Sequence, residues 1–215
     1  MIPKGFIFDM DGTMFDTEGI SLDAYDTVGE MFGIRLSEEE KLGFLGLPSE
    51  KIAQRFYTLF GADFDWQGFR KKKMEVQNAV IAKIGVPIKA GLFEILTYAK
   101  ENQIRCAVAT STSRERAMPL LAGADVLDAF SAVICGDQIT HGKPNPDIFL
   151  KAAEELQLSP KECVVFEDSR NGILAAKAAG MFSVLIPDKI APDKEMRQAA
   201  DLLCTNLIEA KEYFE

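Results

Sequence analysis

The sequence predicts an α/β fold, a doubly wound parallel sheet interrupted by a helical insertion near the N-terminus. Two observations predict it. Short apolar runs recur along the chain and, from residue 86 onward, alternate with segments of helical spacing, as strands buried in a parallel sheet do. Between the first run and Gly85, about seventy residues show helical spacing alone.

The expected strands are runs of mostly continuous hydrophobicity, which suits strands buried on both faces of a sheet. In a doubly wound sheet, ligands bind beyond the carboxyl ends of the strands. The residues that follow each run are therefore where function is expected. The runs are Lys4–Phe8, Ile104–Ala109, Ala132–Cys135, Cys163–Phe166 and Phe182–Ile186.

Helices are expected between these strands. Gly180 lies where a helix C-terminus favours glycine, and Pro146 and Pro192 lie near helix starts. The expected helices are Leu92–Glu101, Ser113–Leu121, Pro146–Leu156, Asn171–Ala179 and Pro192–Leu203.

The insertion is expected to form a separate helical domain. Ser37 and Glu40 make a capping box inside it, and apolar residues at helical spacing run on both sides. We expect residues 1–15 and 86–215 to form the α/β core and residues 16–85 to form the insertion. Because the insertion follows the first strand, it is well placed to act as a lid.

The composition excludes several classes of protein. The 215 residues include 24 Lys and Arg, 33 Asp and Glu, and one His, giving a net charge of −9. This acid excess opposes nucleic-acid binding, and one His cannot form a His-cluster metal site. No apolar run approaches the ~20 residues that span a bilayer, and the four cysteines show no metal or disulfide spacing. We expect a cytoplasmic monomer that binds neither nucleic acid nor membrane.

Two carboxylates follow the first apolar run. Asp9 and Asp11 alternate along the chain, so both point to the same side, and Gly12 begins a turn. Taken alone, this pattern also fits an ordinary Asx turn between a strand and a loop. It fits an EF-hand poorly, because the glycine of that calcium loop is its sixth residue.

The other strand ends also carry polar groups. Thr110, Ser111 and Thr112 could bind an anion or simply cap a helix. Lys143 could be a solvated loop residue, and Glu167 with Asp168 could cap a helix. Their coincidence at strand ends favours one shared site over independent roles.

The carboxylates of such a site would require cations. Two unit charges 4 Å apart repel by about 4 kcal/mol at an effective dielectric constant of ~20. Mg²⁺ is the natural cation for oxygen ligands without His or Cys, and Lys143 adds one positive charge. The sequence therefore predicts an Mg²⁺ crevice that contains Asp9, Asp11, Glu167 and Asp168.

The polar residues at the strand ends form four short motifs. In their order along the chain, these motifs resemble those of the haloacid dehalogenase-like superfamily, in the branch with a helical cap after the first motif. The resemblance extends from Phe6 to about Ile186. It implies a Rossmann-like core, a helical cap and phosphoryl-transfer chemistry. The motifs are Asp9-x-Asp11-Gly-Thr13, Thr110-Ser111, Lys143-Pro144 and Glu167-Asp168-Ser169-Arg170-Asn171-Gly172.

The resemblance implies a role for each matching residue. Asp9 would be the nucleophile, which is ionised at pH 7 and needs no base, and Asp11 the general acid and base. Thr110 and Lys143 would complete the catalytic set. The residues implied to bind phosphate are Asp11, Gly12, Thr110, Ser111 and Lys143. Those implied to hold Mg²⁺ are Asp9, Asp11 through its carbonyl, Asp168 and Glu167, the last as a ligand or a neighbour of the ligands.

Within the family, the residues favour a phosphatase that hydrolyses a small phosphorylated metabolite through an aspartyl-phosphate. The dehalogenases lack the second Asp, here Asp11. The β-phosphoglucomutase branch has a His at the place of Ser21 and an Arg at the place of Ser49, after the turn Gly46-Leu47-Pro48. Both are absent, and a mutase is the alternative. A phospho-acceptor signalling domain is a third hypothesis, although a receiver would not need the insertion.

Substrate contacts are expected from polar cap residues at near-helical spacing. The basic run Arg70–Lys73 could reach a second anionic group or form a solvated helix face. His141 could approach the site or remain a loop residue. The expected substrate contacts are Thr17, Glu18, Ser21 and Tyr25.

Overall fold

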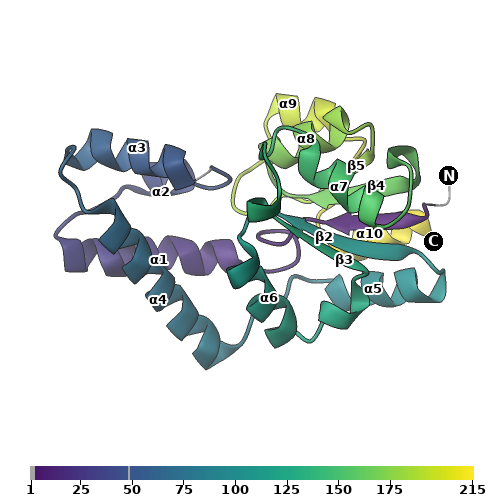
Figure 1. Ribbon diagram of the computed structural model, residues 1–215, viewed down its shortest axis with the longest axis horizontal. Helices are drawn as coiled ribbons and strands as arrows, with labels where there is room; N and C mark the ends of the chain where they lie inside the picture. The colour runs from purple at the N-terminus through teal and green to yellow at the C-terminus, as the bar shows by residue number, and fades with distance from the viewer. Residues whose placement is uncertain (1–2, 48) are drawn as a thin grey trace. The chain divides into compact units, whose positions relative to one another are not determined.

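One parallel sheet organises the larger part of the protein. The computed structural model describes residues 3–47 and 49–215, and these form six parallel strands in the order β3-β2-β1-β4-β5-β6 (Figure 1). The strands are β1 Gly5–Phe8, β2 Arg105–Thr110, β3 Ala132–Cys135, β4 Cys163–Glu167, β5 Phe182–Leu185 and β6 Leu202–Leu203. The prediction of a doubly wound α/β sheet is confirmed.

Helices cover both faces of this sheet. One helix contacts β1, β2 and β3, the next contacts β4 and β5, and on the other side two helices pack against each other. In chain order these are α7 Asp147–Glu155, α8 Arg170–Ala178, and the pair α5 Leu92–Glu101 with α10 Leu207–Phe214. The remaining helices here are α6 Arg114–Gly123 and α9 Lys194–Ala199.

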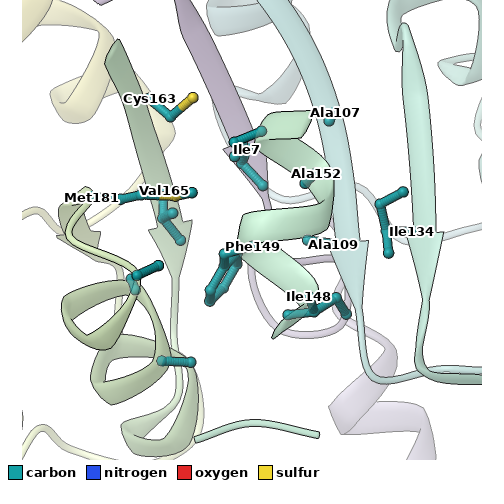
Figure 2. Packing of buried hydrophobic residues seen from close by; sticks show 14 of the residues in the cluster. Ile7, Ala107, Ala109, Ile134, Ile148, Phe149, Ala152, Cys163, Val165 and Met181 are labelled. Atoms are coloured by element: carbon teal, nitrogen blue, oxygen red, sulfur yellow. The ribbon is translucent and has the colours of Figure 1, made fainter. Parts of the chain in front are cut away.

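Alternation along β1 divides the core into two layers. Ile7 faces the cluster that contains Phe149 of α7 and Val165 of β4, as Figure 2 shows. Phe6 points the other way, and its ring lies 5.5 Å from that of Phe214 in α10. Both β1 side chains are fully buried, as expected for a central strand covered on both faces.

The register of the central strands brings their carboxyl ends to one edge. Phe8 of β1 pairs with Val108 of β2 and with Phe166 of β4. The next residue, Asp9, donates its backbone N–H to the carbonyl of Phe166 at 2.9 Å. Asp9 and Glu167 therefore end neighbouring strands at the same level, which is where ligands of such sheets bind.

The last expected helix is wrong in its C-terminal part. Helix α9 ends at Ala199, and Leu202–Leu203 forms β6 beside β5 instead of continuing the helix. Asp201 explains the change, because its carboxylate accepts hydrogen bonds from the Ser183 N–H and hydroxyl at 2.8 and 3.0 Å. These bonds align the following residues with β5.

The chain divides into two compact units. The α/β unit comprises Met1–Asp16 and Ile88–Glu215, and the helical unit comprises Thr17–Pro87. Within the α/β unit, Phe15 forms a β-bridge with Ile88, so the outgoing and returning segments are paired where the chain passes between units. Among the described residues, no helix has the length and apolarity needed to cross a membrane.

The helical unit has an aromatic core of its own. Phe56 is fully buried, and its ring lies 4.7 Å from that of Trp66 and 4.9 Å from that of Phe69. The expected capping box is present at the start of α2, where Glu40 accepts from the Ser37 N–H at 2.6 Å. The helices are α1 Thr17–Phe32, α2 Glu38–Leu42, α3 Ser49–Phe60 and α4 Trp66–Ile84.

Candidate active site

Lys143 connects the strand ends of the α/β unit. Its ammonium lies 2.5 Å from Asp9 Oδ1 and 2.7 Å from Glu167 Oε1, and it donates to the carbonyl of Ala109 at 3.1 Å. The Lys143 side chain is only 5% exposed, although it comes from the loop before α7. Three polar groups on three adjacent strands thus surround one buried cation.

Burial and charge act in opposite directions on this cluster. Burial raises the pKa of Asp9 above its usual value, and the Lys143 ammonium opposes that rise. Burial disfavours the Lys143 ammonium, but the carboxylates of Asp9 and Glu167 raise the pKa of Lys143 overall. Lys143 therefore stays protonated and stabilises the ionised form of Asp9.

Glu167 is held on both of its oxygens. Oε1 accepts from Lys143, while Oε2 accepts from the Ser169 N–H at 2.8 Å and from its hydroxyl at 2.9 Å. The carboxylate lies directly over Gly172 in the first turn of α8, where a Cβ would come within 1.7 Å of Oε1. These contacts make Glu167 a partner of Lys143, and its expected place as a ligand of Mg²⁺ or a neighbour of the ligands stays a prediction.

A tight turn carries Asp11. The Gly12 N–H donates to the carbonyl of Phe15 at 2.8 Å, and Gly12 has a φ of 87°, in the left-handed region that favours glycine. Asp11 Oδ2 accepts a hydrogen bond from the Thr112 hydroxyl at 2.7 Å, with the Thr110 hydroxyl 3.5 Å away. Thr112 was expected, with Thr110 and Ser111, as a possible hydrogen-bond donor to an anion, but its contact with Asp11 was not predicted.

Asp168 packs against the same turn. It is 9% exposed, and it accepts a hydrogen bond from the Thr13 hydroxyl at 3.3 Å. A Cβ on Gly12 would lie 2.4 Å from Asp168 Oδ2, so glycine leaves the space that this carboxylate occupies. The first and fourth motifs are thus in direct contact.

The buried carboxylates of the α/β unit include possible ligands for Mg²⁺. No cluster of three or more His, Cys, Asp or Glu side chains suited to a metal ion occurs in the described part of the chain. Mg²⁺, however, often takes one or two protein carboxylates and completes its shell with water and substrate phosphate. Asp9 and Asp168 supply two buried carboxylates from adjacent strand ends, and this donor set fits Mg²⁺ chemically.

The other expected residues of the α/β unit lie differently. Ser111 is exposed, and its backbone carbonyl lies so close to Gly136 that a Cβ there would be 2.3 Å from it. His141 is exposed and its Nδ1 lies 2.9 Å from Asp147 Oδ2, so it belongs to the loop before α7 rather than to the Lys143 cluster.

Two of the expected substrate contacts in the helical unit, Ser21 and Tyr25, both lie beside Lys73. Ser21 accepts a hydrogen bond from the Lys73 ammonium at 2.5 Å, and this ammonium also lies 4.0 Å from the centre of the Tyr25 ring. Tyr25 itself is 4% exposed and stacks with Phe69, so it is a core residue and not an exposed substrate contact. The helical spacing of Tyr25 in the sequence is consistent with a core position and with an exposed position alike.

Thr17 and Glu18 begin α1. In the basic run, Arg70 and Lys71 are exposed and Lys72 pairs with Glu75 at 3.0 Å. Ser49 is the first residue of α3, and the preceding Pro48 lies outside the described residues.

Comparison with known proteins gives a consistent family. The family model described as haloacid dehalogenase-like hydrolase matches residues 6–186. The chain is 34% identical over 178 residues to the phosphorylated carbohydrates phosphatase of Thermotoga maritima, covering 83% of this chain and 82% of the relative. It is 28% identical to the β-phosphoglucomutase of Bacillus subtilis, covering 98% and 96%. The crystal structure of CbbY from Rhodobacter sphaeroides in complex with phosphate matches with a TM-score of 0.83, at 28% identity and 96% coverage of both chains.

Proposed function

The chain belongs to the haloacid dehalogenase-like hydrolases, and we propose that it is an Mg²⁺-dependent phosphatase of small sugar phosphates that works through an aspartyl-phosphate on Asp9. The observation that carries the proposal is the buried Lys143 ammonium between Asp9 and Glu167. A carboxylate held beside a fixed cation at the ligand-binding edge of the sheet is suited to attack a phosphoryl group, whose negative charge the cation offsets.

The proposed reaction has two steps. Asp9 Oδ attacks phosphorus, the bond from phosphorus to the sugar oxygen breaks, and Asp11 gives a proton to the leaving oxygen. A water molecule then attacks the aspartyl-phosphate, Asp11 takes a proton from it, and inorganic phosphate leaves. Lys143 and the Thr110 hydroxyl hold phosphoryl oxygens during both transfers. Asp9 and Asp168 would hold Mg²⁺, which when bound offsets phosphoryl charge and favours ionised Asp9.

Two residues favour hydrolysis over mutase chemistry. A mutase must hold a sugar phosphate for the return transfer, and the family residues associated with that branch are replaced by Ser21 and Ser49. The relation to a β-phosphoglucomutase keeps the mutase as the second candidate. We further propose that the helical unit acts as a cap, that Thr17, Glu18 and Ser21 contact the substrate, and that the protein is a cytoplasmic monomer.

The test is a panel of phosphorylated metabolites incubated with Mg²⁺ and scored for inorganic phosphate. The panel includes β-glucose 1-phosphate, which is also scored for isomerisation to glucose 6-phosphate. We expect phosphate release from one or more sugar phosphates, its loss on chelation of the metal, and its loss in Asp9→Asn. The matched control is Asp125→Asn, an exposed Asp with a φ of 56° that Asn also adopts.

Each outcome discriminates between the hypotheses. Phosphate release by Asp9→Asn at the wild-type rate would exclude Asp9 as the nucleophile. Isomerisation without release of phosphate would establish the mutase instead. A stable phosphoenzyme that does not turn over would identify a phospho-acceptor domain.

A further inference from the structure

Two carboxylates and two lysines form a network between the loop that follows β5 and the segments beside the Asp11 turn. Asp188 Oδ1 accepts from the Lys89 ammonium at 2.6 Å and lies 3.7 Å from the ammonium of Lys189. Lys189 in turn lies 2.8 Å from Asp16 Oδ1. None of the catalytic roles proposed above uses these four residues.

Asp188 is an unusual member of this network. Its side chain is 5% exposed, and its Oδ2 is the one buried side-chain nitrogen or oxygen in residues 3–47 and 49–215 that has no hydrogen-bond partner. A buried carboxylate disfavours the folded state unless cations compensate it. The lysines compensate Oδ1 of Asp188, whereas burial of Oδ2 without a partner disfavours the folded state.

The network holds both segments that flank the Asp11 turn. Asp16 directly follows the turn, and Lys89 lies on the returning segment, where its N–H donates to the carbonyl of Met14 at 2.9 Å. The side chains of both residues are held by the same loop, Asp16 through Lys189 and Lys89 through Asp188. The turn is thus held at its end and along its side.

The turn itself is internally closed. The N–H groups of Met14 and Phe15 both donate to the carbonyl of Met10, at 2.9 and 3.0 Å. These bonds close residues 10–15 into one hydrogen-bonded turn, so the contacts at Asp16 and Lys89 bear on the segment that carries Asp11. The Thr112 hydroxyl, which follows β2, donates to Asp11. In the strand order, β2 and β5 lie on opposite sides of β1, so Asp11 is contacted on one side and its turn is held from the other.

We propose that Asp188 and Lys189 are positioning residues that fix the orientation of the Asp11 turn and hence the proton transfer to the leaving group. The proposal rests on the proposed function, because it takes Asp11 as the general acid. In the transfer step, the bond from phosphorus to the leaving oxygen breaks while the proton moves from the Asp11 carboxyl to that oxygen. The demand for this proton rises with the basicity of the leaving group.

The test compares two substrates that differ in this demand. p-Nitrophenolate leaves without protonation, whereas phenolate is more basic and gains from it. For each enzyme, kcat/KM is measured with p-nitrophenyl phosphate and phenyl phosphate in the presence of Mg²⁺, because kcat/KM reports the steps up to release of the first product. The ratio of the two values is independent of the fraction of folded enzyme, so a merely structural effect cancels.

The variants are Lys189→Met, Asp188→Asn, the conservative Lys189→Arg, and Asp11→Asn as the reference for loss of the acid. Lys161→Met is the matched control, an exposed lysine next to β4 at the amino ends of the strands. Lys189→Met retains the aliphatic stem and removes the contact with Asp16. It provides a second route to the answer if Asp188→Asn fails to fold.

We expect Lys189→Met and Asp188→Asn to lower kcat/KM for phenyl phosphate about tenfold more than for p-nitrophenyl phosphate, in the direction of Asp11→Asn. Lys189→Arg should keep the ratio of the two kcat/KM values close to that of the wild type, and Lys161→Met should leave this ratio unchanged. An unchanged ratio in Lys189→Met, beside an altered one in Asp11→Asn, would overturn the positioning role alone. An unchanged ratio in Asp11→Asn would instead refute the acid role in the proposed function.

Discussion

Replacing Gly172 by alanine would displace the carboxylate of Glu167. An ideal Cβ at this position would lie 1.7 Å from Oε1, 1.8 Å from Cδ and 2.3 Å from Oε2 of Glu167. No heavy atoms can approach so closely, and Glu167 is 1% exposed, so its carboxylate has no solvent to move into. The substitution therefore tests whether the packed position of Glu167 holds Lys143 in place.

The expected loss of stability in Gly172→Ala follows from the hydrogen bonds that must break. Displacement removes the hydrogen bonds from Lys143 at 2.7 Å and from the Ser169 N–H and hydroxyl at 2.8 and 2.9 Å. Hydrogen bonds to charged groups contribute about 1.5–3 kcal/mol each, and disrupting a buried ion pair costs about 3–5 kcal/mol. Because these contributions overlap, we expect the free energy of unfolding to fall by about 3–5 kcal/mol.

The assay is urea unfolding followed by far-UV circular dichroism, combined with phosphate release from the preferred substrate. Gly142→Ala is the control, because a Cβ there meets nothing within 4 Å and the residue has no positive φ. It should change stability by less than about 1 kcal/mol. A Gly172→Ala protein as stable and as active as wild type would refute the packing of Glu167 over α8 and its control of Lys143.

Three further outcomes are expected. Lys143→Met should abolish phosphate release and destabilise the protein by about 3–5 kcal/mol, since two buried carboxylates lose their shared cation; wild-type stability in a melt would contradict this. Phe56→Ala should destabilise the helical unit by about 3–5 kcal/mol, with exposed Tyr57→Ala as the control; Trp66, the one tryptophan, reports the unfolding by fluorescence. The four buried thiols should resist iodoacetamide at pH 8 in the native protein and all react in guanidinium, because burial raises the pKa of Cys106 to about 12 and of Cys163 and Cys204 to about 11; rapid labelling of the native protein would contradict that.

The strand-end residues could be predicted because parallel strands bring their carboxyl ends to one edge. Asp9, Thr110 and Glu167 all end strands in the sequence, and the register places Asp9 and Glu167 side by side. The need for a basic residue such as Lys143 could be predicted, since clustered buried acids require a cation. Its reach from a loop to three separate strands depends on tertiary structure, which no local pattern encodes.

Other features were wrongly predicted or missed for physical reasons. Tyr25 has the spacing of an exposed helical position, but the aromatic core of the helical unit absorbs its ring. β6 is two residues long and depends on the carboxylate of Asp201 bonding to Ser183, and its apolar run, Leu202–Cys204, is shorter than those of the expected strands. Asp188 follows a strand, as Asp9 and Asp168 do, and only its burial and ion pairs distinguish it from a solvated loop residue.

The position of β1 at the centre of the sheet sets the order in which a growing chain acquires activity. β1 is made first, but its neighbours begin only at Arg105 and Cys163. All residues of the helical unit lie within Thr17–Pro87, so its contacts can form while the strand that precedes Asp9 still lacks partners. A growing chain therefore contains all residues of the insertion well before it contains all strands of the sheet, and any chain ending before Glu167 leaves Asp9 without the strand end that completes its surroundings.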